Sequence, residues 1–412
     1  MTILFSRAFH MLERFLASHR IMIAAAGSLL AGSSAWAPAR ANDPIRPLIE
    51  VAPLPAPGLP MPAPALAPPL ASPLAPPADL RPMPREETRE APRPARPRLS
   101  ALELIAGANG AGFLPVLPRS SDQSPVILKL QVMLKRAHAS PGVIDGYYGD
   151  NVAKAVSAFE AMRGLPVNGI LDPLVWSVLE ALDTSEPLVP YVIQPQDVAG
   201  PFVPELPKDY AELARLETLA YRNPAELLAE KFQMDEDLLR QINPDSTFTE
   251  AGATITVANV GRPASRKVAR LVADKVRKQL FGYDALGALV VSYPATIGSA
   301  AMPSPTGIHA VRAVAVNPEY WYRPKVNFQQ GSNTQALRLP PGPNNPVGSV
   351  WIGLDRPTYG IHGTPEPSRI DKPNSHGCIR LTNWDARELV RLVEPGVPVE
   401  FLEPEIVTGS VR

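Results

Sequence analysis

The stretch YGIHGTPEPSRIDKPNSHGCIRL, residues 359–381, contains Cys378, the only cysteine among 412 residues. A lone cysteine cannot form an internal disulfide, so its presence needs another explanation. His362 lies sixteen positions before it. Cysteine is a strong nucleophile as its thiolate, and a nearby cationic imidazole would lower the pKa of the thiol. The pair therefore predicts nucleophilic catalysis, whereas a cysteine without a partner is most often a small buried hydrophobe.

The residues next to the pair suggest how a reaction intermediate is stabilised. Gly377 lets backbone approach backbone, and the consecutive N–H groups of His376, Gly377 and Cys378 are candidate donors to an oxyanion. Gly363 follows His362 and has no side chain to orient the imidazole, so any third member of the site must be a backbone carbonyl or a group from elsewhere. His376 also lies near the thiol and is the alternative base.

Arg380 and Ser375 are the candidate substrate-binding residues. Arg380 lies two positions after Cys378, on the same side of an extended strand. Its planar guanidinium suits bidentate contact with a substrate carboxylate. The competing interpretation is a salt bridge to a local acid such as Asp385.

These residues resemble the active-site signature of the L,D-transpeptidases of the YkuD family, which act on bacterial cell walls. The resemblance rests on His-Gly-Thr, a sixteen-residue step and Ser-His-Gly-Cys-Ile-Arg. Ser304-Pro-Thr-Gly307 and the turn-rich stretch 340–348 match two further motifs of the family. The resemblance implies Cys378 as nucleophile, His362 as base and inhibition by carbapenem-type acylating agents.

The family resemblance also implies the substrate. A donor tetrapeptide stem of peptidoglycan would be cleaved at the carbonyl of its third residue, before the terminal D-alanine, and the thioacyl enzyme would pass the chain to an amine. Another stem as acceptor gives a 3→3 crosslink, and a protein lysine gives anchoring; a D-amino acid or water gives exchange or carboxypeptidase activity. A hydrolase of the same linkages and a non-catalytic wall-binding scaffold are the alternatives. No cofactor or metal is predicted, and the implied role is in cell-wall biogenesis and cell shape.

Composition and the N-terminus indicate where the protein works. Lysine plus arginine equals aspartate plus glutamate at 40 each, which gives no reason to expect a nucleic-acid partner. Residues 1–41 read as a signal peptide, with three arginines, an apolar run over 21–31 and a cleavage site after Ala41. The run is shorter than the ~20 residues of a spanning helix, so secretion is favoured over a retained anchor. We therefore expect a periplasmic, wall-associated protein with no stable membrane span after cleavage.

Proline, with 50 residues in the chain, separates the N-terminus from the folded domains. Residues 42–99 form a low-complexity Pro/Ala-rich segment, in which missing N–H donors and restricted φ angles prevent helix and sheet. This predicts a disordered linker, more simply a spacer than a docking ligand for a proline-binding module.

Residues 100–184 predict a small helical domain. Apolar residues recur at helical spacing after residue 127, after Asp150 as a cap, and after Asp172-Pro173, where Leu182 is expected to face inward. The order of motifs is similar to the three-helix peptidoglycan-binding domain, which implies binding of wall polymer. If so, deleting the domain should weaken binding to isolated sacculi and spare turnover of a small soluble tetrapeptide. A purely structural role predicts loss of both.

Two further domains follow, and a tail at 405–412 ends the chain. Residues 188–259 suggest the strand, helix, helix, strand order of a diverged LysM module, with Leu219–Tyr221 as a strand. Residues 264–404 predict a mostly-β catalytic domain, although the stretch from Val268 to Leu280 is equally compatible with a helix. Thr382-Asn-Trp-Asp385 predicts a capping box that starts a helix, and alternation after residue 397 predicts a closing strand.

Overall fold

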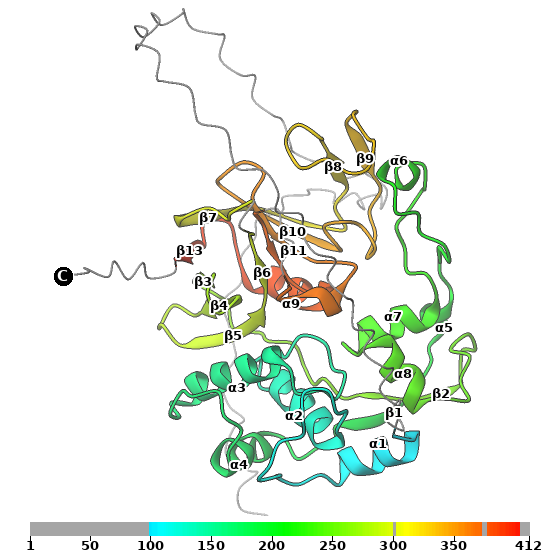
Figure 1. The fold of residues 1–412 in the computed structure, drawn as a ribbon, viewed down its shortest axis with the longest axis vertical. Helices are drawn as coiled ribbons and strands as arrows, with labels where there is room; N and C mark the ends of the chain where they lie inside the picture. The colour runs from blue at the N-terminus through cyan, green and yellow to red at the C-terminus, as the bar shows by residue number, and fades with distance from the viewer. Residues whose placement is uncertain (1–98, 300–301, 373–376, 404–412) are drawn as a thin grey trace, which may run out of the picture. The chain divides into compact units, whose positions relative to one another are not determined.

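A computed structural model describes residues 99–299, 302–372 and 377–403, all within the compact unit Arg89–Arg412 (Figure 1). The predicted signal peptide, the linker as far as residue 98 and the tail lie outside the described residues, as do Ser375 and His376. Within the described ranges, no helix has the length and apolar character needed to span a bilayer.

The catalytic domain is built on a mixed nine-stranded sheet with the order β5-β4-β3-β13-β7-β10-β11-β12-β6. Strand β13 is parallel to β3 and β11 is parallel to β12, whereas the other neighbours are antiparallel. This confirms a mostly-β domain, and the helical alternative for 268–280 is wrong because β3 and β4 pair as a hairpin. The strands are β3 (Arg270–Asp274), β4 (Gln279–Tyr283), β5 (Leu289–Pro294), β6 (Thr296–Ile297), β7 (Gly307–Val316), β10 (Val350–Leu354), β11 (Gly360–His362), β12 (Ile379–Arg380) and β13 (Pro398–Leu402).

Helix α9 (Asn383–Leu392) lies against β10 and β11 (Figure 1). Its Leu389 is fully buried in the core of the sheet, and burial of one such side chain contributes ~1.5–3 kcal/mol. The Thr382 hydroxyl accepts a hydrogen bond from the Asp385 N–H at 3.2 Å, as a cap should. The Asp385 carboxylate does not complete the predicted capping box with Thr382. Instead, it accepts a hydrogen bond from the Ser140 hydroxyl at 2.9 Å.

Residues 100–184 contain the three predicted helices, α2 (Pro125–Arg136), α3 (Asp150–Arg163) and α4 (Pro173–Leu182). Asp172 caps α4 by accepting from Val175 N–H at 2.8 Å. Asp150 is not a cap, since Gly149 holds that position and Asp150 is the first helical residue. Leu182 is 46% exposed and not inward, because α4 ends there, about one turn past its last packed residue, Leu179.

Residues 188–259, called here the 188–259 module, pair β1 (Leu188–Val192) antiparallel with β2 (Thr254–Ala258) and carry α7 (Pro224–Lys231) and α8 (Glu236–Ile242) between them. The short helices α5 (Pro195–Val198) and α6 (Tyr210–Leu213) precede α7. The predicted strand at Leu219–Tyr221 is wrong: this segment crosses to the catalytic domain, where Leu219 N–H donates to the Pro341 carbonyl at 2.9 Å. Helix α1 (Ala101–Asn109) shares a core with this module.

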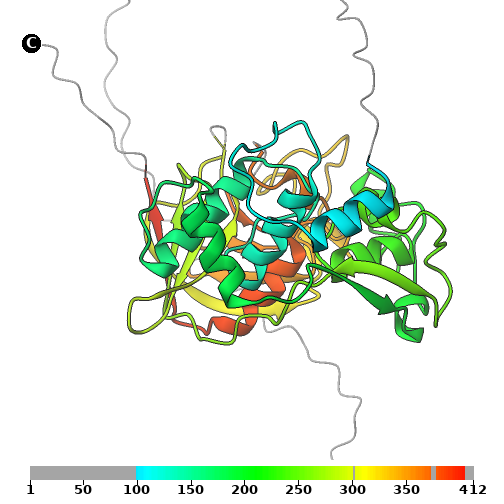
Figure 2. The same ribbon diagram turned by 90° about the horizontal axis from the view of Figure 1, so that it is seen from below.

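The helical domain contacts the free edge of the catalytic sheet (Figure 1, Figure 2). Ser140 N–H donates to the Ser292 carbonyl at 2.9 Å, and Ser292 N–H donates to the His138 carbonyl at 3.1 Å. This pairing satisfies backbone groups of the edge strand β5, which would otherwise remain available to another chain. The two domains are therefore joined through backbone as well as side chains.

Candidate active site

His362 and Cys378 are brought together by the parallel pair β11 and β12. His362 ends β11 and lies opposite Arg380 in the register, while Cys378 directly precedes β12. Leu381 N–H donates to the His362 carbonyl at 2.8 Å, which continues the pairing past the strand end. The sixteen-residue step in the sequence is thus the connection between two neighbouring strands.

The His362 imidazole is held from two directions. Its Nδ1 lies 2.7 Å from the Gly363 carbonyl oxygen, which can only accept, so Nδ1 carries the proton and Nε2 retains its lone pair. Trp351, its cross-strand neighbour on β10, stacks on the ring at 5.6 Å between centroids and 18° between planes. The side chain is only 5% exposed. The backbone carbonyl anticipated as a third member of the site is therefore that of Gly363.

Burial keeps both reactive groups neutral in the free protein. It is the main cause that lowers the pKa of His362 to about 3; the nearby Arg380 charge contributes to this shift, and the hydrogen bond to Gly363 opposes it. Burial also raises the pKa of Cys378 to about 11. The Cys378 Sγ donates to the Thr358 carbonyl at 3.7 Å. Both shifts favour a neutral thiol and a neutral imidazole over the expected thiolate with a cationic histidine, because desolvation opposes the charged form of each group.

Both glycines of the motif sit where a side chain would not fit. Gly377 has a φ of +96°, and a Cβ there would lie 2.8 Å from Tyr359 Cε1 and 3.2 Å from the Pro303 carbonyl oxygen. A Cβ on Gly363 would collide with Asn383 Oδ1. Glycine is therefore required at both positions for the backbone to pass next to the reactive side chains.

His362, Cys378 and Arg380 line one cavity of about 560 Å³. Arg380 Nε is buried and has no hydrogen-bond partner among the described residues. The alternative pairing with Asp385 is wrong, because that carboxylate is turned to Lys135 and Ser140. The cavity is completed by Tyr210, Met302, Pro303, Tyr320, Val326, Asn327, Phe328, Pro346, Val347, Trp351, Thr358, Tyr359, Glu366 and Arg369.

Comparison with known proteins identifies two parts of the chain. Residues 269–401 match the L,D-transpeptidase catalytic domain of the YkuD family. These residues therefore form an L,D-transpeptidase catalytic domain of the YkuD type. Residues 123–179 match the peptidoglycan-binding domain, and both matches indicate peptidoglycan as the polymer on which the enzyme acts.

The same part of the chain is similar in sequence to two proteins named as L,D-transpeptidases. The chain is 28% identical over 178 residues to the Bacillus licheniformis protein named as L,D-transpeptidase YkuD, a match that covers 43% of this chain and 92% of that one. It is 25% identical over 188 residues to the Escherichia coli L,D-transpeptidase YbiS, covering 44% and 61%. The solved L,D-transpeptidase 3 of Mycobacterium tuberculosis is 17% identical, with a TM-score of 0.28 over 37% of this chain and 76% of that one.

Asn383 is a residue of this L,D-transpeptidase domain that sequence reasoning missed. Its fully buried side chain accepts from Ser349 N–H at 3.0 Å and donates to the Pro343 carbonyl at 3.0 Å and to Glu230 Oε2 at 2.8 Å. Through its contact with Gly363, it fixes the backbone that orients His362. In the sequence, Asn383 reads only as the second residue of a helix start.

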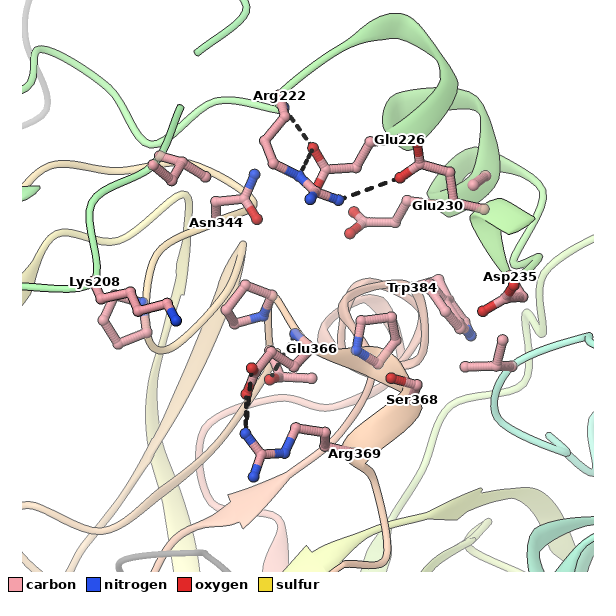
Figure 3. A pocket seen from close by; sticks show the side chains of 18 of the residues that line it. Lys208, Arg222, Glu226, Glu230, Asp235, Asn344, Glu366, Ser368, Arg369 and Trp384 are labelled. Atoms are coloured by element: carbon pink, nitrogen blue, oxygen red, sulfur yellow. Dashed lines mark hydrogen bonds and ion pairs between the residues drawn. The ribbon is translucent and has the colours of Figure 1, made fainter. Parts of the chain in front are cut away.

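A second cavity of about 940 Å³ lies between the transpeptidase domain and the 188–259 module. Figure 3 shows Arg222 and Glu226 of the module on one side, and Glu366 and Arg369 of the transpeptidase domain on the other. Both pairs are ion pairs, at 3.2 Å and 3.3 Å. The two cavities share a wall formed by Tyr210, Pro346, Glu366, Arg369 and Arg380.

Proposed function

We propose that the protein is a cysteine-dependent L,D-transpeptidase in which Cys378 attacks peptidoglycan stem tetrapeptides and His362 is the acid–base. The observation that carries the proposal is the hydrogen bond from His362 Nδ1–H to the Gly363 carbonyl. It leaves the unprotonated Nε2 as the acceptor in the cavity that also contains Cys378.

Acylation begins from a neutral pair. As Cys378 Sγ attacks the carbonyl carbon of the third stem residue, the thiol proton moves to His362 Nε2, so no free thiolate accumulates in the buried cavity. The carbonyl oxygen becomes an oxyanion, for which the N–H groups of Gly377 and Cys378 are the proposed donors. His376 is the third proposed donor and lies outside the described residues. Collapse breaks the bond to D-alanine, and His362 returns the proton to the departing amine.

Transfer reverses these roles. A neutral acceptor amine attacks the thioester carbonyl and His362 takes a proton from the attacking nitrogen; the C–S bond then breaks, and His362 gives this proton to Cys378 Sγ, which regenerates the thiol. A stem acceptor gives a 3→3 crosslink, and a protein lysine gives anchoring. Ser375 and Arg380 are the proposed substrate-binding residues. We further propose that the enzyme is exported by residues 1–41 and works in the periplasm, attached to the wall through residues 100–184 and the 188–259 module.

The direct test is muropeptide analysis of tetrapeptide-rich wall after incubation with the purified chain. We expect release of D-alanine together with new 3→3 linked dimers, and neither product with Cys378→Ala. Release of D-alanine with tripeptides alone would identify a carboxypeptidase, and an unchanged profile would identify a wall-binding scaffold.

A further inference from the structure

A segment of the 188–259 module reaches the catalytic cavity. Residues 199–222, called here the strap, leave the module and lie against the hairpin of β8 (Tyr320–Tyr322) and β9 (Leu337–Leu339). Leu213 and Leu219 of the strap form a small core with Tyr322 and Leu339 of this hairpin. The strap is therefore held on the catalytic domain by a buried apolar contact.

Tyr210 is the strap residue that enters the cavity. Its ring makes edge-to-face contacts with Tyr320, Tyr322 and Phe328, at centroid distances of 6.2, 5.2 and 6.1 Å. Its backbone N–H donates to Gln330 Oε1 at 3.1 Å. Contacts on both ring and backbone fix where the side chain points. Tyr210 thus belongs to the wall shared by the two cavities, although it precedes the catalytic domain in the chain.

The hydroxyl of Tyr210 makes no hydrogen bond with any residue that the structure describes, in contrast to its backbone. Burial raises the pKa of this phenol to about 12, even though the nearby Arg380 charge opposes the shift. The group is therefore a neutral O–H donor at physiological pH. A half-buried donor without a protein acceptor is available to a ligand.

Arg380 is the second donor on this wall. Its Nε is buried without a partner in the described ranges, and the acid whose charge acts most strongly on it, Glu366, is paired with Arg369. A guanidinium with a buried Nε and a phenol, neither of these donors having a partner among the described residues, suit an anionic oxygen acceptor at the same wall. A carboxylate has the oxygen atoms to accept from both groups.

We propose that Tyr210, delivered by the strap, and Arg380 together bind a free carboxylate of the peptidoglycan stem peptide. The inference rests on the proposed function for the identity of the peptide, and it makes Tyr210 a substrate-contacting residue from outside the catalytic domain. Because the same wall opens onto the larger cavity, the bound carboxylate marks where a stem passes from the Cys378 cavity into the groove beside the 188–259 module.

The test measures binding to the full chain carrying Cys378→Ala, which prevents turnover. Calorimetric titrations use the tetrapeptide with all carboxylates free, the same peptide as its C-terminal carboxamide, and a peptide amidated at the third residue, so that the source of the carboxylate is identified. Tyr210→Phe retains the ring contacts and removes only the hydroxyl. Tyr283→Phe, which lies outside both cavities, is the matched control.

We expect Tyr210→Phe to weaken binding of the free-carboxylate peptide roughly tenfold, the effect of losing one hydrogen bond to a charged group. If the bound carboxylate is the one that a given amidated peptide lacks, Tyr210→Phe should bind that peptide as tightly as its parent does. Tyr283→Phe should bind all three peptides with the affinity of its parent. Equal affinity of Tyr210→Phe and its parent for the free-carboxylate peptide would overturn the inference alone. No binding of any stem peptide to the parent would overturn the proposed function as well.

Discussion

Lys135 of the peptidoglycan-binding domain lies 3.2 Å from Glu388 of the catalytic domain, and the ion pair is buried, with both side chains under 5% exposed. Lys135 Nζ also lies 3.3 Å from Asp385 Oδ1. The two carboxylates raise the pKa of Lys135 against the effect of burial, and Lys135 lowers the pKa of Glu388. Glu388 further accepts from Ala264 N–H at 2.9 Å and from the Tyr293 hydroxyl at 3.1 Å. The polymer-binding domain is therefore part of the support of the catalytic fold.

Lys135→Met should destabilise the protein by about 3–5 kcal/mol, because it leaves two buried carboxylates without their cation. Urea denaturation of the full chain measures the change in the free energy of unfolding. Lys267→Met is the matched control: its pair with Glu394 is exposed, at 62% and 69%, and should contribute at most about 1 kcal/mol. Equal effects of the two substitutions would show that the buried pair does not join the domains.

Deletion of residues 100–184 should abolish turnover of a soluble tetrapeptide and weaken binding to sacculi. The deletion removes Lys135 and the backbone partners of Ser292, which exposes the edge of the catalytic sheet. Sedimentation with isolated sacculi and release of D-alanine measure the two activities. A truncated chain that turns over soluble peptide at the full rate would contradict the coupling of the domains.

The reactivity of Cys378 should increase with pH well beyond neutrality, because the pKa of its thiol is raised to about 11. Alkylation by iodoacetamide, followed by mass spectrometry from pH 5 to 11, measures this. Since the pKa of His362 is lowered to about 3 and that of Cys378 is raised to about 11, neutral imidazole and neutral thiol coexist around neutral pH. The kcat/KM of the reaction should therefore be flat around neutrality. An alkylation midpoint near pH 6 would instead indicate a thiolate–imidazolium pair.

The lowered pKa of His362 also determines how the free energy of unfolding depends on pH. His362 has a lower pKa in the folded state than the ordinary value of 6.5, so the unfolded chain binds an additional proton below that value. The contribution of His362 should make the free energy of unfolding fall as the pH decreases from about 6.5 towards 3. Denaturation of His362→Gln over this range should show a shallower decrease than the parent chain.

The two histidines of the motif can be separated by substitution. Cys378→Ala should abolish acylation and covalent labelling by a carbapenem-type agent, detected by intact mass. His362→Ala should slow acylation on the order of a hundredfold or more. His376→Ala should cost less, since an oxyanion donor on the backbone N–H survives the substitution. If His376→Ala were the more damaging while both variants remain folded, the base would be His376.

Gly363→Ala should lower activity by displacing the carbonyl that holds His362. The new Cβ would collide with Asn383 Oδ1, and Asn383 is itself held by Ser349, Pro343 and Glu230. We expect a loss of about 1–3 kcal/mol in stability and slower acylation. Gly112→Ala, where a Cβ meets open space, is the control for both measurements. Normal acylation by Gly363→Ala would exclude this role of the carbonyl.

The sequence alone determined the features that depend on local chemistry. Helical periodicity located α2, α3 and α4, alternation located β13, and the Asp172 and Thr382 side chains started helices where expected. The motif around Cys378 and His362 predicted the candidate nucleophile and base, because these roles depend on residue type, and the structure places the two residues at neighbouring strands. Local errors fell at element ends and at Leu219–Tyr221, where contacts with distant residues outweigh local preference.

Only the tertiary structure decided the protonation of the pair and the composition of the cavity. Burial sets the pKa values of His362 and Cys378, and burial results from packing that sequence spacing does not reveal. Tyr210 lines the cavity of Cys378 although 168 positions separate the two residues in the chain. Lys135 contacts Glu388 across 253 positions. Such contacts form because a closed core brings together apolar and charged groups from distant segments, and a local pattern contains no information about which distant segment will supply the partner.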